Sequence, residues 1–142
     1  MPSPQLELDN FCRVVVTGDT KWEDSKAVEQ VLDQLVTAAD QRGKFTLLTG
    51  MASGADEHAR TWAAGRSVDI FAEPLSSGTY PTPMHNYNYL LLSHKPDLVL
   101  AFKSNFAPNW GSSSCVRGTE HMCRIAAQAD VPVLLNAKKW LE

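Results

Sequence analysis

The sequence predicts a single α/β domain with a five-stranded, mostly parallel sheet and helices on both faces. Three observations lead to this fold class. Short apolar runs alternate with helical patterns along the chain after residue 12. The apolar runs are continuous rather than alternating, as in parallel strands that are covered on both faces. The 142 residues, of which 44% are hydrophobic and 20% charged, suit one globular domain.

The expected strands are short runs rich in β-branched and other apolar residues. Gly18 and Gly50 end the first two of them. The five strands are expected at residues 13–17, 45–49, 68–72, 97–102 and 131–135. The first strand is expected at the centre of the sheet, between the second and the fourth, because this order brings the loops after all three strands to one edge.

The expected helices carry their apolar residues on one face. They are expected at residues 25–41, 53–64, 84–94 and 118–129. Asp24 or Ser25 is expected to cap the first helix, because short polar side chains accept hydrogen bonds from the free N–H groups of a first turn. Gly65 is expected to end the second helix.

Composition and charge argue against several protein classes. The net charge of −3 does not indicate a strongly basic nucleic-acid surface. No apolar run approaches the roughly 20 residues that a membrane span needs. Three cysteines without a Cys-x-x-Cys pair, and four histidines without ligand spacing, predict neither a disulfide scaffold nor a metal site. Residues 1–12 are expected to be a leader without signal-peptide character and residues 13–142 the domain, in a cytoplasmic protein.

The loops after the first, second and fourth strands carry the candidate ligand contacts. Ligands of open parallel sheets bind beyond the carboxyl ends of the strands. Two of these loops place glycine and a small hydroxyl residue directly before a helix, where unpaired N–H groups attract anions. The pattern is typical of a phosphate or nucleotide site. The candidate ligand-binding residues are Gly18, Asp19, Thr20, Trp22, Gly50, Ser53, Gly54, Asp56, Arg117, Gly118, Thr119 and Glu120.

Structural explanations compete with this interpretation. A glycine at a strand-to-helix turn is usually only a turn. Ser53 and Asp56 have the spacing of a capping box, and Arg117 could be a solvated surface charge. Residues 103–117 favour the functional interpretation, because a loop this long in a compact domain is usually functional or disordered. The chain has no Gly-x-Gly-x-x-Gly, Walker or Gly-x-Ser-x-Gly motif, so no familiar catalytic set is present.

These loops resemble the SLOG superfamily of Rossmann-like proteins, and most closely its small YpsA-related group. The resemblance runs from Arg13 to Leu135 and implies a Rossmann-like fold with a nucleotide or nucleotide-derived ligand. Asp19 stands where relatives usually have a second glycine. The group's motifs correspond here to Thr17-Gly18 with Trp22-Glu23-Asp24, to Gly50 with Gly54-Ala55-Asp56, to Asn88, which the resemblance adds to the ligand-binding residues, and to Arg117-Gly118-Thr119.

The superfamily also includes the LOG enzymes, which are similar to nucleoside-monophosphate phosphoribohydrolases. Their catalytic arginine and glutamate correspond to Tyr87 and Met122 here, so the resemblance leaves catalysis open. A hydrolase would need a rearranged site, for which the candidate catalytic residues are Glu120, Asp19 and Asp56.

Three functional hypotheses follow. The first is a sensor or sequestering protein that binds an ADP-ribose-like or NAD-like nucleotide and needs no other cofactor. The alternative is a nucleotide N-glycosidic hydrolase. A weaker alternative is binding of single-stranded nucleic acid, because the superfamily includes a DNA-processing protein, but the acidic balance disfavours it. The expected partner is a nucleotide-like small molecule, with no nucleic acid or membrane; self-association into a homo-oligomer is left open.

Overall fold

The structure of the chain is a computed structural model. The structure describes residues 12–39, 45–50, 53–66, 68–71, 83–106 and 118–136. Five strands and four helices alternate along this part of the chain. Nearly all of the predicted leader lies outside the described residues.

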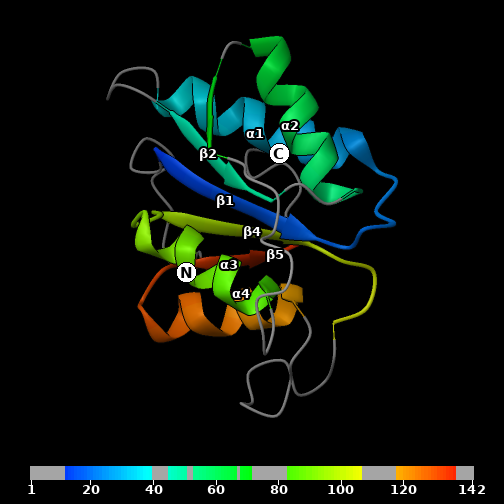
Figure 1. Cartoon of the computed structure of the whole chain (residues 1–142). Coiled ribbons are helices and arrows are strands. Elements are labelled where there is room, and N and C mark those ends of the chain that lie inside the picture. The colour runs from blue at the N-terminus through cyan, green and yellow to red at the C-terminus, as the bar shows by residue number, and fades with distance from the viewer. Residues whose placement is uncertain are drawn as a thin grey trace, which may run out of the picture.

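The sheet has five parallel strands in the order β3-β2-β1-β4-β5 (Figure 1). Its strands are β1 (Arg13–Gly18), β2 (Thr46–Thr49), β3 (Asp69–Phe71), β4 (Leu98–Phe102) and β5 (Val133–Leu135). The prediction that the first strand is central, with the second and fourth strands beside it, is confirmed. Strand β4, which lies between β1 and β5, is buried along its whole length, which explains its continuous apolar sequence.

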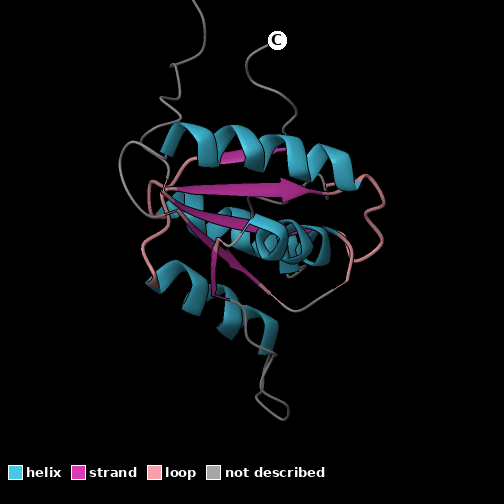
Figure 2. Cartoon of the chain, turned by 90° about the horizontal axis from the view of Figure 1, so that it is seen from above, coloured by secondary structure: helices cyan, strands magenta, loops and turns pink. Residues whose placement is uncertain are grey.

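Helices cover both faces of the sheet, as Figure 2 shows with the strands lying between them. The helices are α1 (Ser25–Ala39), α2 (Ala55–Arg66), α3 (Pro83–Ser93) and α4 (Gly118–Gln128). Residues of α1 and α2 form a core cluster with one face of the sheet, and residues of α3 and α4 form a second cluster with the other face. Two helices therefore pack on each side, which is a Rossmann-like arrangement.

Alternate residues of β1 supply the two cores. Val14 and Val16 belong to the cluster under α1 and α2, while Val15 belongs to the cluster under α3 and α4. All three side chains are fully buried. Since successive side chains of a strand point to opposite faces, a central strand needs apolar residues at every position.

Two predicted details of the helix ends have different outcomes. Asp24 caps α1, because its Oδ1 accepts a hydrogen bond from the backbone N–H of Ala27 at 3.1 Å. The prediction that Gly65 ends the second helix is wrong, since α2 continues to Arg66. Arg66 forms an ion pair with Asp33 of α1 at 2.9 Å, which fixes the last turn against α1.

Within the described ranges, no helix is long and apolar enough to cross a membrane.

Candidate functional site

The strand order reverses between β1 and β4, and the loops after these two strands meet at the carboxyl edge of the sheet (Figure 1). The backbone N–H of Asp19 donates a hydrogen bond to the carbonyl oxygen of Phe102 at 2.8 Å. This bond joins the first residue after β1 to the last residue of β4. Such a reversal point is where open parallel sheets bind ligands.

The loop after β1 is fixed to the start of α2. The carbonyl oxygen of Asp19 accepts hydrogen bonds from the N–H groups of Trp22, at 3.1 Å, and Ala55, at 3.2 Å. The Nε2 atom of His58, on the first turns of α2, lies 2.7 Å from the carbonyl oxygen of Trp22. Since a carbonyl only accepts, Nε2 is the donor in this bond. Two segments more than 30 residues apart in sequence thus form one unit.

Packing within the protein accounts for Gly18 and Gly54. A Cβ atom at Gly54 would lie 2.2 Å from the carbonyl oxygen of Asp19, and the φ angle of Gly54 is +72°, a conformation that favours glycine. A Cβ atom at Gly18 would lie 2.1 Å from the carbonyl oxygen of Phe102. The sequence suggested that such glycines admit an anion to the backbone. In the structure the backbone of Phe102 approaches Gly18 and that of Asp19 approaches Gly54. An anion beside Gly54 stays a prediction.

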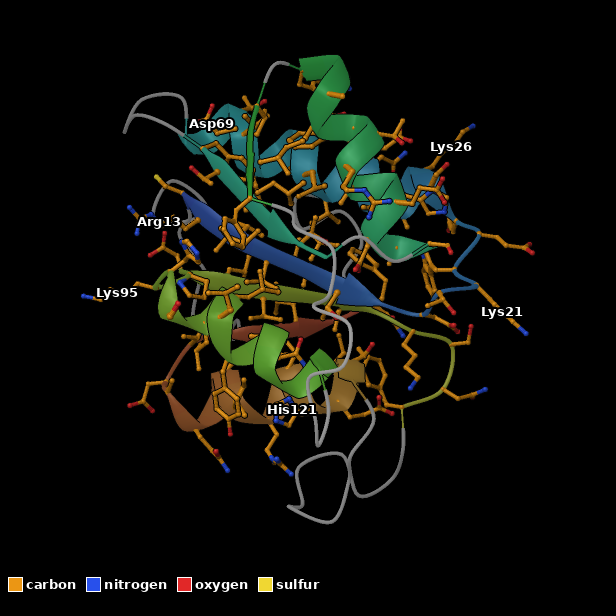
Figure 3. All side chains as sticks on the ribbon, viewed as in Figure 1. Arg13, Lys21, Lys26, Asp69, Lys95 and His121 are labelled. Atoms are coloured by element: carbon orange, nitrogen blue, oxygen red, sulfur yellow. The ribbon has the colours of Figure 1, made fainter. Side chains whose placement is uncertain are left out.

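The side chains of the first loop take part in local contacts. Oδ1 of Asp19 accepts a hydrogen bond from the N–H of Lys21 at 3.0 Å, and Thr20 between them is exposed. The ring of Trp22 lies 5.8 Å from that of Phe102, at 49°. Figure 3 shows Lys21 pointing outward at this edge. The loop is therefore ordered by its own carboxylate and by one aromatic contact with the end of β4.

A buried ion pair joins the end of β4 to the first turn of α4. Nζ of Lys103 lies 2.7 Å from Oε1 and 2.9 Å from Oε2 of Glu120. The Glu120 side chain has no exposed surface, and that of Lys103 is 15% exposed. A negative charge in the first turn of a helix is favourable, because the free N–H groups there carry partial positive charge. Glu120, a candidate catalytic residue, is thus held in a contact that occupies both of its oxygens.

The backbone of Lys103 is held as firmly as its side chain. Its N–H donates to Oδ1 of Asn136 and its carbonyl oxygen accepts from Nδ2 of the same amide, both at 2.8 Å. Asn136 follows β5, has a φ angle of +52°, and donates its own N–H to Ala101 at 2.7 Å. Sequence reasoning missed Lys103. The available signal was a lysine directly after a strand of five apolar residues, at the expected reversal point.

Asn88, the residue suggested by the family resemblance, connects α3 to α4. Its Nδ2 atom lies 2.9 Å from the carbonyl oxygen of Gly118 and 3.1 Å from Nδ1 of His121. Asn88 and His121 are both buried, and the ring of the exposed Tyr89 meets the His121 ring edge to face at 5.3 Å. Figure 3 shows His121 on α4 beneath the sheet. The amide nitrogen of Asn88 therefore positions the start of α4.

The remaining candidate residues, in the loops after β2 and β4 and at the starts of α2 and α4, differ in their exposure. Asp56 and Thr119 are buried and Ser53 is exposed. The carbonyl oxygen of Gly50 accepts a hydrogen bond from Nη1 of Arg60 at 2.7 Å. Arg117 lies outside the described residues, so its proposed contact with a ligand stays a prediction.

The two positions of the LOG catalytic pair have separate outcomes. Met122 is fully buried in the cluster between α4 and the sheet, so this position faces the core. Tyr87 belongs to α3, but its side chain lies outside the described part.

Beside Met122, burial and the neighbouring charge of Glu120 raise the pKa of the Cys123 thiol to about 12, so the thiol is protonated at neutral pH.

No cluster of three or more His, Cys, Asp or Glu side chains that could hold a metal ion occurs among the residues that the structure describes.

Comparison with known proteins supports the family resemblance. Residues 12–77 match the model of the "YspA, cpYpsA-related SLOG family", which confirms the predicted resemblance over this part of the chain. The fold is similar to that of DNA processing protein A (DprA) from Streptococcus pneumoniae, with a TM-score of 0.62 and 16% sequence identity. The match covers 97% of this chain and 54% of that one, so this chain spans about half the length of DprA. No curated protein matches the sequence.

Proposed function

We propose that this chain, which matches the SLOG family over residues 12–77, binds a nucleotide or nucleotide-derived ligand such as ADP-ribose. The ligand would lie at the carboxyl edge of the sheet, between the loop after β1 and the first turn of α4. One observation carries the proposal: the reversal of strand order between β1 and β4 brings Asp19, Lys103 and Gly118 to the same edge.

The chemistry of this edge suits the phosphate of such a ligand. The free N–H groups at the start of α4 carry partial positive charge, and Gly118 at the start of the helix has no side chain to obstruct an anion. Thr119 adds a hydroxyl group next to it, and Arg117 precedes both in the sequence. Since the carbonyl oxygen of Asp19 already accepts from the first N–H of α2, the start of α4 is favoured over that of α2 as the anion site.

Binding without turnover is favoured over N-glycosidic hydrolysis. A hydrolase needs a carboxyl group that reaches the bond between the sugar and the base. Glu120 is fully buried with both oxygens bonded to Lys103, and Oδ1 of Asp19 accepts from the backbone of its own loop. These contacts tie both carboxylates to neighbouring groups of the protein, which favours a structural role over a catalytic one.

Native mass spectrometry of the purified protein, followed by calorimetric titration with AMP, ADP-ribose and NAD, tests this function. We expect at least one of these nucleotides to bind with a stoichiometry of one per chain. A single-stranded oligonucleotide serves as the comparison for the nucleic-acid alternative. Failure of all three nucleotides to bind, or binding of the oligonucleotide in their place, would overturn the proposal.

A further inference from the structure

We infer that Lys103 contacts a phosphate oxygen of the ligand and that Glu120 is the positioning residue that aims its ammonium group. This inference rests on the proposed function and deepens it, because it names the side chain that recognises the charged part of the ligand. Three observations support it: the contacts that fix Lys103, the N–H of its ammonium group that Glu120 does not bind, and the position of that N–H in the fold.

Lys103 is held in place at both ends. The amide of Asn136 bonds to its backbone N–H and to its carbonyl oxygen, and the carboxylate of Glu120 bonds to its ammonium group. A free lysine side chain has much rotational freedom, and ordering it during binding costs affinity. Here that ordering is already complete in the protein alone.

The ion pair leaves one donor of the ammonium group over. A lysine ammonium has three N–H donors, and the two oxygens of Glu120 occupy two of them. In the described part of the chain, the remaining donor of Lys103 has no partner. The Lys103 side chain keeps 15% of its surface exposed, whereas that of Glu120 keeps none, so of the two side chains only that of Lys103 is open to a ligand.

The position of this donor matches the proposed site. Lys103 directly follows Phe102, whose carbonyl oxygen bonds to the N–H of Asp19 across the reversal point. Glu120 belongs to the first turn of α4, whose free N–H groups attract anions. A charge-assisted bond to a phosphate oxygen is stronger than a bond to a neutral hydroxyl, which favours phosphate as the acceptor.

The stability of the fold does not by itself explain the ion pair between Lys103 and Glu120. Replacement of a buried ion pair by apolar residues of similar volume is often neutral or stabilising, whereas removal of one partner leaves a buried charge and destabilises the fold. The test therefore removes both charges together. Lys103→Met combined with Glu120→Gln keeps the net charge at −3 and leaves no unpaired charge. The matched control, Asp33→Asn with Arg66→Met, neutralises an ion pair between α1 and the far end of α2.

Calorimetric titration with AMP and with adenosine measures the contribution of the phosphate. We expect the Lys103/Glu120 double variant to bind AMP about 10- to 100-fold more weakly and adenosine as well as the wild type does. The control pair should leave both affinities unchanged. Equal losses for AMP and adenosine would overturn the assignment of Lys103 to phosphate.

A measurement on the wild type keeps the test independent of how the variant folds. The ¹⁵N signal of the Lys103 ammonium group is expected to shift when AMP or inorganic phosphate is added, and not when adenosine is added. An unmoved signal with bound AMP, or an unchanged AMP affinity in the folded double variant, would overturn the role of Lys103 and leave the proposed function standing. A wild-type protein that binds no nucleotide would overturn both.

Discussion

The carbonyl oxygen of Asp19 accepts a hydrogen bond from the backbone N–H of Ala55 at 3.2 Å. Through this bond, a loop that follows the central strand takes up the first free donor of α2. The loop that ends at Gly54 approaches so closely that no side chain fits between the two backbones. The loop after β1 and the start of α2 are therefore joined backbone to backbone at this edge of the sheet.

Substitution of Gly54 by alanine is expected to destabilise the fold. A Cβ atom there would lie within 2.6 Å of three backbone atoms of Asp19 and Thr20, at a φ angle that suits glycine. We expect the free energy of unfolding to fall by about 2 kcal/mol or more. Urea unfolding followed by circular dichroism measures the change.

Gly65→Ala is the matched control for this prediction. Gly65 is exposed within α2 and a Cβ atom would meet nothing within 4 Å. Alanine there should raise the free energy of unfolding by about 0.5 to 1 kcal/mol, because it favours the helix. Similar effects of the two substitutions would contradict the assigned contact between Gly54 and the first loop.

Arg117→Ala is expected to weaken nucleotide binding and to leave the melting temperature nearly unchanged. A charge-assisted hydrogen bond to phosphate is worth about 1.5 to 3 kcal/mol, so the affinity should fall by at least tenfold. The control Lys95→Ala removes one positive charge from the opposite edge of the sheet, where Figure 3 shows Lys95 beside Arg13. This substitution should leave the nucleotide affinity unchanged. A fall in the melting temperature without ligand would instead make Arg117 a structural residue.

The protein is expected not to release adenine from AMP. The resemblance to the LOG enzymes aligns Met122 with their catalytic glutamate, and the Met122 side chain is uncharged and faces the core. Loss of one preorganised charge of this kind typically costs about 10² to 10³ in rate. Glu120 lies two residues earlier, which turns its side chain by about 200° around α4. Chromatography of AMP incubated with the protein measures adenine, and release that disappears in Glu120→Gln would show a relocated catalytic carboxylate.

The Asp33–Arg66 pair predicts a loss of stability in acid. Burial of Asp33 raises its pKa, but hydrogen bonds from Arg66 and Trp62 and the charge of Arg66 lower it more, so its pKa lies below the ordinary value of 3.8. A carboxyl group with a lowered folded-state pKa stabilises the protein above its unfolded pKa, and this stability is lost as the pH falls through the folded value.

Unfolding experiments at pH 6 and pH 3 measure this contribution. Asp33→Asn should reduce stability at pH 6 and make the remaining stability less dependent on pH across this interval. The effect is expected to be small, because the side chains of Asp33 and Arg66 are 44% and 46% exposed and water screens the pair. An unchanged pH dependence in the variant would rule out Asp33 as its source.

The alternation of continuous apolar runs with amphipathic segments was enough to predict a parallel sheet with helices on both faces. The central place of the first strand was predicted because it brings the loops after the first, second and fourth strands to one edge. Asp24 as a helix cap also follows from local chemistry. The end of α2 could not be predicted in this way. Gly65 is a local stop signal, but α2 includes it and ends one residue later at Arg66, whose side chain pairs with Asp33 of α1.

By itself, the sequence determined the parallel α/β fold, because hydrophobic periodicity and the glycines that end the strands are local properties of the chain. It also predicted the carboxyl edge of the sheet as the place of the candidate residues. Only the tertiary structure decided which contacts Gly54 and Glu120 make. The backbone of Gly54 packs against that of Asp19, and Glu120 is buried in an ion pair with Lys103. These roles arise from contacts between strands, loops and helices that are distant in sequence, and no local pattern records which distant groups will meet.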